Sequence, residues 1–91
     1  MSNSTNEIII TENDNGDIFY QVDGKFHRDD GPAIEWVTGY KGWFQNDKFH
    51  RLDGPAFESP DGNHTWWING ENIPCDTQEE FEQLLRLRAF W

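Results

Sequence analysis

The chain has little positive charge, one cysteine and no long apolar run. Its 91 residues include 7 lysines and arginines against 17 aspartates and glutamates, which gives a formal net charge of −10. Proteins that bind nucleic acid or anionic membranes need clustered cations, so we expect neither as a direct partner. No run approaches the ~20 apolar residues of a membrane-spanning helix. The charge instead favours a protein partner with a basic surface.

The single cysteine, Cys75, excludes an internal disulfide and a cysteine-based zinc site. We therefore expect the protein in a reducing cytoplasm. Catalytic motifs are also missing, because the sequence contains no nucleophile elbow, phosphate-binding loop or dinucleotide fingerprint. We expect no enzymatic activity, no catalytic residue, no cofactor and no metal site.

A nine-residue motif occurs at residues 25–33 and again at residues 48–56, with eight identical positions at a spacing of 23. Ahead of the motif, Tyr20, Trp43 and Trp66 occupy equivalent positions. The third unit starts in the same way but lacks the motif, as is usual for a terminal repeat that ends the stacking. The expected units are residues 20–42, 43–65 and 66–74.

Each unit is typical of short antiparallel strands joined by tight turns. The aromatic segment 19–22 favours a strand. Asp-Gly at 23–24 and Asn-Gly at 69–70 are the dipeptides that type I′ hairpin turns prefer. Residues 7–11 predict a first strand. We expect a mainly β fold in which residues 7–75 form an antiparallel meander of hairpins with a period of 23.

The two ends differ from the repeats. Residues 1–6 are polar and predict a disordered tail. Residues 76–91 predict an amphipathic helix, because Phe81, Leu84 and Leu85 recur at helical spacing and the acidic residues precede the arginines. A sheet with one apolar face needs a cover, so we expect this helix, or a second copy of the protein, to cover it.

The unit of aromatic strand, Asn-Gly-type turn, second strand and Asp-Gly turn resembles the MORN repeat, a β-hairpin stacked into an elongated antiparallel sheet. Segments 43–62 and 66–70 carry the resemblance best, and it covers residues 16–74. Where a MORN unit has a Gly-x-Gly strand, this chain has His-Arg-x-Asp-Gly-Pro-Ala. The chain is therefore similar to a divergent group of phage and bacterial type. The resemblance implies an interaction scaffold.

The repeated motif is the first candidate for a functional role. We expect a structural role for its residues His27, Asp30, Gly31, Pro32, His50, Asp53, Gly54 and Pro55. Equivalent positions in successive hairpins lie about 9.5 Å apart, too far for two histidines to share one zinc ion. Arg28 and Arg51 are expected to pair with carboxylates of the motif or with Glu35 and Glu58. Their fork geometry also fits a phosphate or carboxylate, so they are candidate ligand-binding residues.

Aromatic residues are the second candidate, with 5 tryptophans, 2 tyrosines and 7 phenylalanines. Neighbours such as Trp66 and Trp67 face opposite sides of a strand. One aromatic row therefore meets the helix, and the other is exposed or covered by a partner. Exposed tryptophans contribute strongly to interfaces. The expected partner-binding residues are Trp43, Trp66, Trp67, Glu35, Glu58, Asp61 and Glu71.

Together these patterns predict a non-enzymatic protein-interaction module with an acidic, aromatic surface. By analogy with the phage-type motif, the hypothesis extends to an inhibitor of a host defence or nucleic-acid enzyme, located in the host cytoplasm. Such a protein would mimic a polyanion in a basic groove. One alternative is a dimer that holds a nucleotide-like ligand between aromatic rings and arginines. Another is a minor structural or adaptor protein of a virion. A homodimer is expected as readily as a complex with another protein.

Overall fold

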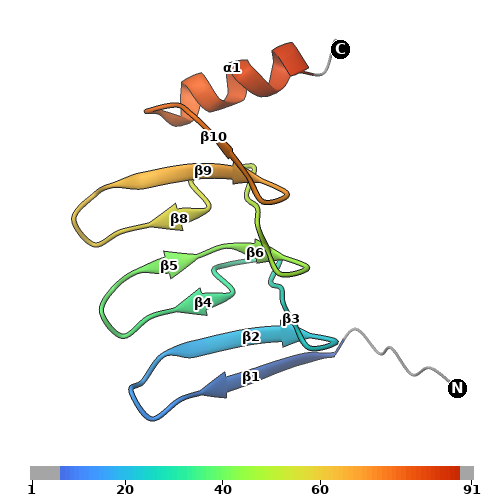
Figure 1. The fold of residues 1–91 in the computed structure, drawn as a ribbon, viewed down its shortest axis with the longest axis vertical. Coiled ribbons are helices and arrows are strands. Elements are labelled where there is room, and N and C mark those ends of the chain that lie inside the picture. The colour runs from blue at the N-terminus through green and yellow to red at the C-terminus, as the bar shows by residue number, and fades with distance from the viewer. Residues whose placement is uncertain (1–6, 89–91) are drawn as a thin grey trace, which may run out of the picture.

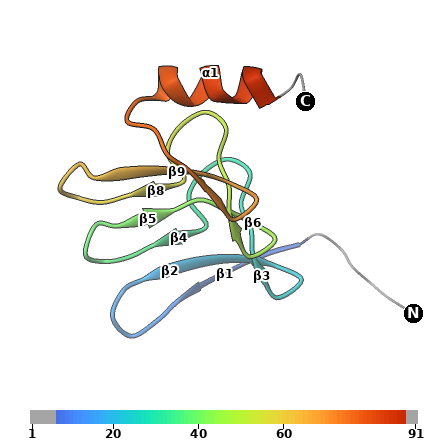
Figure 2. The same cartoon turned by 45° about the horizontal axis from the view of Figure 1, so that its top comes forward.

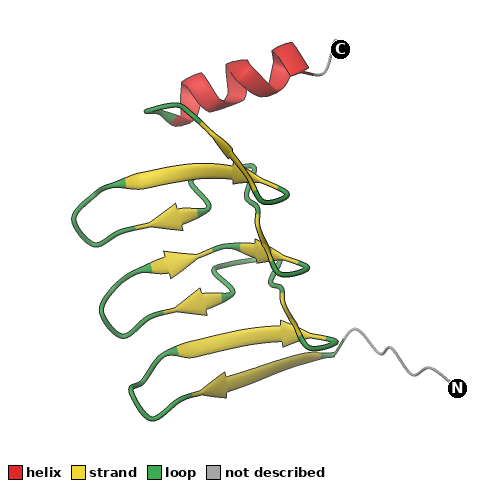
Figure 3. Cartoon of the chain, viewed as in Figure 1, coloured by secondary structure: helices red, strands yellow, loops and turns green. Residues whose placement is uncertain are grey.

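The computed structural model describes residues 7–88, so the predicted tail at 1–6 and the last three positions of the predicted helix lie outside the described residues. Ten strands precede one helix (Figure 1). Their bounds are β1 Ile8–Glu12, β2 Ile18–Val22, β3 Lys25–Phe26, β4 Ile34–Glu35, β5 Lys41–Gly42, β6 Phe44–Gln45, β7 Lys48–Phe49, β8 Phe57–Glu58, β9 His64–Ile68, β10 Glu71–Ile73 and α1 Gln78–Arg88. The prediction of a mainly β fold with a C-terminal helix is confirmed (Figure 3).

Every strand pairing in the described chain is antiparallel. One sheet has the order β1-β2-β4-β5-β8-β9-β10, with β3 paired to β2, while β6 and β7 pair separately. The hairpins lie in sequence order between β1 at one end and α1 at the other (Figure 1). The molecule is flat, with extents of 40 × 38 × 17 Å. Figure 2 shows the connections after β3 and β7 rising from the sheet on the side of α1.

The tight turns use positive φ angles, as the dipeptides predict. Asp-Gly at 23–24 has φ angles of 53° and 79°, and Asn-Gly at 69–70 has 49° and 82°. The turn between β6 and β7 does the same without glycine, because Asn46 and Asp47 have φ angles of 51° and 69°. Asp47 also accepts a hydrogen bond of 2.7 Å from the backbone N–H of Phe26. That bond links the turn to the preceding unit.

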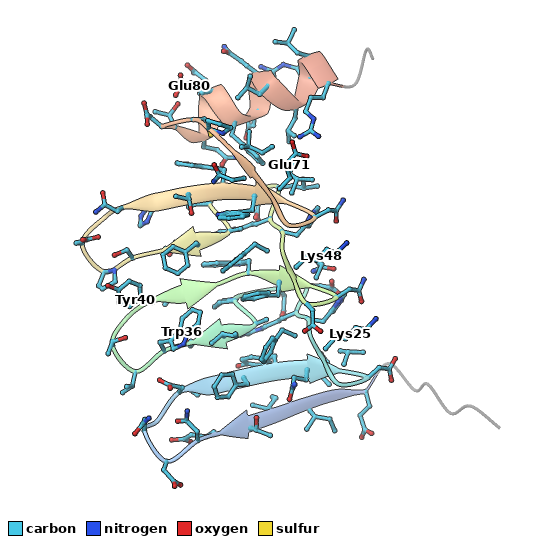
Figure 4. All side chains as sticks on the ribbon, in the orientation of Figure 1. Lys25, Trp36, Tyr40, Lys48, Glu71 and Glu80 are labelled. Carbon is cyan, nitrogen blue, oxygen red and sulfur yellow. The ribbon has the colours of Figure 1, made fainter. Side chains whose placement is uncertain are left out.

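The lysines of these turns mark one edge of the stack. Lys25 and Lys48 begin β3 and β7, and both are exposed. Figure 4 places them at the same edge, away from Trp36 and Tyr40 at the other end of the hairpins. Lys25 and Lys48, the first residues of the two motif copies, are therefore set along one edge, whereas Lys41 lies in β5 of the main sheet.

Aromatic rings stack from hairpin to hairpin. Phe26 lies 5.9 Å from Phe19 and 5.7 Å from Phe44, measured between ring centroids. Phe49 lies 4.3 Å from Phe44 and 5.1 Å from Trp67. Such pairs stabilise a structure by about 0.5–1.5 kcal/mol each beyond the area they bury. This column joins successive units within a protein that has few fully buried side chains.

The helix covers one end of the sheet. Phe81 of α1 is fully buried and packs against Trp66 and Ile73, with Leu84 and Leu85 at the margin. These contacts involve β9 and β10, the last strands of the sheet. The expectation that the helix covers a whole apolar face is therefore wrong, because its described length reaches only the terminal unit (Figure 1).

Candidate functional site

The repeated motif forms two loops, which we call the first corner loop (residues 27–32) and the second corner loop (residues 50–55). Each follows a two-residue strand and leads back into the main sheet. Through Nδ1, His27 and His50 each accept a hydrogen bond from a backbone N–H of the next turn, at 3.2 and 3.1 Å. Both histidines thus tie one unit to the following unit.

Arg51 is fixed by contacts within the second corner loop and next to it. Its Cζ lies 3.9 Å from the ring centroid of Trp43, in a cation–π contact. Its Nε donates to Asp53 Oδ1 at 2.9 Å. Its Nη1 donates to the carbonyl oxygen of Pro55 and to Glu58 Oε2, both at 3.1 Å. The hydrogen bond from Arg51 lowers the pKa of Asp53.

Arg28 makes the same contacts in the first corner loop. Its Cζ lies 4.0 Å from the ring centroid of Tyr20. Its Nε donates to Asp30 at 3.0 Å, and its Nη1 donates to the carbonyl oxygen of Pro32 at 3.2 Å and to Glu35 at 3.4 Å. The ion pairs that the sequence predicts for the two arginines are present.

The glycine of the motif leaves room for the guanidinium group. A Cβ at Gly31 would lie 2.7 Å from Arg28 Cζ, and one at Gly54 would lie 2.6 Å from Arg51 Cζ. Neither glycine has a positive φ, so space and not backbone conformation requires it. Each corner loop therefore holds an arginine between an aromatic ring on one side and a glycine on the other.

Several residues expected to bind a partner are engaged within the chain. Trp66 is only 6% exposed and donates its Nε1–H to Gln78 Oε1 at 2.7 Å. Its assignment as an exposed anchor is wrong, because α1 covers it. Glu35 and Glu58 are half-buried and bonded to the corner-loop arginines. They therefore form no free acidic rim.

The other expected partner-binding residues do not gather in one patch. Trp67 is half-buried in the aromatic column, and its Nε1–H donates to Thr65 Oγ1 at 2.8 Å. Asp61 and Glu71 lie at opposite ends of β9, and Arg88 donates to Glu71 at 3.0 Å. Of the seven expected partner-binding residues, only Trp43 lines a groove near the repeated motif.

This groove, which we call the corner groove, lies between the two corner loops and has a volume of about 560 Å³. Asp29, Asp30 and Asp53 line it and are exposed, with Trp43 and Leu52 beside them. The arginines that also line it are already bonded to carboxylates. Three aspartates thus face two arginines in the lining, and both arginines also pair with Glu35 or Glu58. The groove therefore combines a net negative charge with apolar surface.

Three residues that line the corner groove, namely Asp29, Gln45 and Leu52, are not among the site residues that the sequence predicts. Asp29 and Leu52 occupy the one position of the motif that differs between its two copies. Asp29 lies 3.2 Å from His27 Nε2 and accepts a 3.0 Å hydrogen bond from Gln45 Nε2. Leu52 is 55% exposed. The exposure of this apolar side chain marks Leu52 as a candidate binding residue, and it can be seen only in the folded structure.

Comparison with protein-family models, curated proteins and solved structures gives no match to this chain. Among residues 7–88, no helix has the length and apolar character needed to cross a membrane. In the same range, no three His, Cys, Asp or Glu side chains gather as metal ligands.

Proposed function

We propose that this protein is a non-enzymatic interaction module that binds a protein partner with basic side chains in the corner groove. The charge of that groove is the observation that carries the proposal. Asp29, Asp30 and Asp53 are exposed there, and the two lining arginines pair with Asp30 and Asp53 and also with Glu35 and Glu58, so the net charge is negative. A basic side chain in the groove would gain attraction from the aspartates and contact with Trp43. The net charge of −10 would steer such a partner from a distance.

The partner class that suits this surface is a protein that itself binds polyanions. An inhibitor of a host defence or nucleic-acid enzyme would occupy the same basic surface as the substrate of that enzyme. The stacked hairpins, joined by the repeated histidine contacts, support the MORN-like interpretation, and the phage-type origin of the motif is part of the same proposal. A cytoplasmic location belongs to the same proposal.

The environment of the cysteine argues against Cys75 as a nucleophile. Cys75 is half-buried beside the Trp66 cluster, and burial raises the pKa of its thiol. A nucleophilic cysteine needs the opposite shift, because the thiolate is the reactive form. Its Sγ–H instead donates to the carbonyl oxygen of Ile73 at 3.4 Å.

Affinity capture tests the proposal, with the full chain as bait and lysate from host cells. The double variant Asp29→Asn, Leu52→Lys makes the corner groove more positive by two charges. The matched control Asp14→Asn, Thr38→Lys makes the same charge change at exposed positions outside the groove. We expect the wild type and the control to capture a basic protein, and the groove variant to capture about tenfold less of it. This protein should elute from the bait by about 0.5 M salt. A partner retained equally by both variants would contradict the proposal.

The nucleotide-binding alternative has less support. Its ligand-binding candidates, Arg28 and Arg51, each make ion pairs with two carboxylates. A phosphate would compete with those carboxylates for the guanidinium groups and would be repelled by the aspartates of the corner groove. A phosphate ligand that remains bound in native mass spectrometry of the purified protein would reverse this order of preference.

Self-association is a second candidate, and the edge strand β1 favours it. Within residues 7–88, β1 pairs with β2 alone, and all its residues are exposed. Ile8, Ile9 and Ile10 are 50%, 51% and 60% exposed. An exposed apolar edge strand is a template for pairing with another strand.

The backbone of β1 defines how a second copy would pair. The N–H of Tyr20 donates to Ala33, on the side of β2 away from β1. Ile10 lies opposite Tyr20, so its N–H and C=O point to the free edge, and those of Ile8 do so by alternation. An antiparallel copy with Ile9 opposite its own equivalent would place Ile8 opposite Ile10 twice. In that register, Ile8 of one copy and Ile10 of the other form hydrogen-bonded pairs, and every one of these isoleucines lies opposite another isoleucine.

Sedimentation over a range of concentrations tests this homodimer. In the proposed register, Ile9→Lys places two lysines opposite each other, so we expect the variant to remain monomeric where the wild type dimerises. Val37→Lys adds the same charge at another exposed position and serves as the control. Added salt should strengthen the dimer by screening repulsion between two acidic copies. Equal association of both variants, or dissociation by salt, would rule out this pairing.

A further inference from the structure

The C-terminal helix shows how the space beside a tryptophan of the repeat can be filled. Gln78 of α1 accepts the Nε1–H of Trp66 at 2.7 Å, and its Nε2 donates to the carbonyl oxygen of Leu52 at 3.0 Å. One carboxamide therefore bridges the indole ring and the second corner loop. Subtracting the spacing of 23 gives Trp43 and Asp29 as the counterparts of Trp66 and Leu52.

The corresponding position one unit earlier is open. Trp43 and Asp29 both line the corner groove. Within residues 7–88, neither the indole N–H of Trp43 nor the backbone carbonyl of Asp29 makes a hydrogen bond. The carboxamide of Gln45 also lines the groove, but its Nε2 donates to the carbonyl oxygen of Arg28 and to Asp29 Oδ1, so it does not join these two groups. The groove thus contains one unpaired donor and one unpaired acceptor, the two groups that a carboxamide joins next to α1.

We propose that the corner groove binds the carboxamide of a glutamine side chain carried by a basic segment of the partner. The carboxamide oxygen accepts from the Nε1–H of Trp43, and its NH₂ donates to the carbonyl oxygen of Asp29. This inference rests on the proposed function, since the aspartates of the groove select the basic residues around the glutamine. A glutamate side chain lacks the donor and is repelled by Asp30 and Asp53. A lysine side chain lacks the acceptor.

Peptide binding to the full chain, followed by ¹H–¹⁵N NMR of the indole groups, tests the carboxamide site. The probe is an acetylated and amidated five-residue peptide with glutamine between two lysines on each side, and two further peptides carry leucine or glutamate at the centre. We expect the glutamine peptide to shift the indole resonance of Trp43 saturably. The other two peptides should bind at least about fivefold more weakly, because they cannot form both hydrogen bonds.

Two variants complete the test. Trp43→Phe identifies the resonance and keeps a ring beneath Arg51, and it should reduce glutamine-peptide affinity to that of the leucine peptide. Trp67→Phe is the control, because its indole N–H already donates to Thr65 and its loss should leave affinity unchanged. The comparison of the three peptides uses the wild-type chain and so does not depend on how the variants fold.

The outcomes separate this inference from the proposed function. Glutamine and leucine peptides that bind equally at Trp43 would overturn the carboxamide site and leave the basic-partner groove in place. A glutamine peptide that shifts only other indole resonances would also overturn the carboxamide site. Absence of any peptide-induced shift at Trp43, together with no basic partner in the capture experiment, would overturn both.

Discussion

Replacing Arg51 with alanine is expected to lower the free energy of unfolding by about 2–4 kcal/mol. The side chain is 20% exposed, and its partner Glu58 is 29% exposed, so solvent screens this pair only in part. The variant loses the contact with Trp43 and leaves the carbonyl oxygen of Pro55 without its donor. The pair with Asp53 adds little, because that carboxylate is 88% exposed.

Urea unfolding measures this loss, with Arg88→Ala as the matched control. Arg88 pairs with Glu71 at the surface, where the side chains are 43% and 64% exposed, so its removal should cost less than about 1 kcal/mol. Gly54→Ala should act in the same direction as Arg51→Ala, because its Cβ would occupy the space of the guanidinium group. An Arg51→Ala variant as stable as the Arg88→Ala control would show that the corner loop does not depend on its arginine.

Replacing Phe81 with alanine is expected to cost about 3–5 kcal/mol, the range for a buried aromatic residue. Its side chain is fully buried, with its ring centroid 6.4 Å from that of Trp66. The substitution leaves a cavity between α1 and the last strands, and it exposes Trp66 to water. We therefore expect both a lower midpoint of thermal unfolding and a red shift of tryptophan fluorescence in the folded state.

The control for this prediction is Leu87→Ala on the same helix. Leu87 is 59% exposed, so its substitution should change the free energy of unfolding by about 0.5 kcal/mol or less. If Phe81→Ala were no more destabilising than Leu87→Ala, the helix would not be a stabilising cap of the sheet.

The hairpins could be predicted from the sequence because their signals are local. The Asp-Gly turn at 23–24 needs only its own dipeptide to favour positive φ. The alternating apolar residues at 33–37 favour a strand of five residues, but β4 contains Ile34 and Glu35 alone. The chain already turns at Trp36, whose N–H donates to Tyr40 and whose C=O accepts from Gly39. Alternating apolar residues do not reveal where such a turn begins.

The candidate site was harder to predict, because it depends on which groups meet across the fold. The sequence indicates correctly that Arg28 and Arg51 pair with carboxylates, yet the same glutamates, Glu35 and Glu58, were also expected in a free rim. One carboxylate cannot serve both roles. Burial of Trp66 depends on the packing of a helix that begins at Gln78. No local sequence pattern specifies against which strands that helix packs.

The ties between units reach only from one unit to the next. His27 bonds to the turn at Asn46, and His50 bonds to the turn at Asn69. Duplication or deletion of a whole 23-residue unit in the gene would therefore preserve the contacts between neighbouring units. The helix would still pack against the tryptophan of the last unit. Each added copy would bring one more arginine-filled corner. The length of the protein, and with it the number of places where a partner can attach, can thus evolve in whole steps without redesign of the fold.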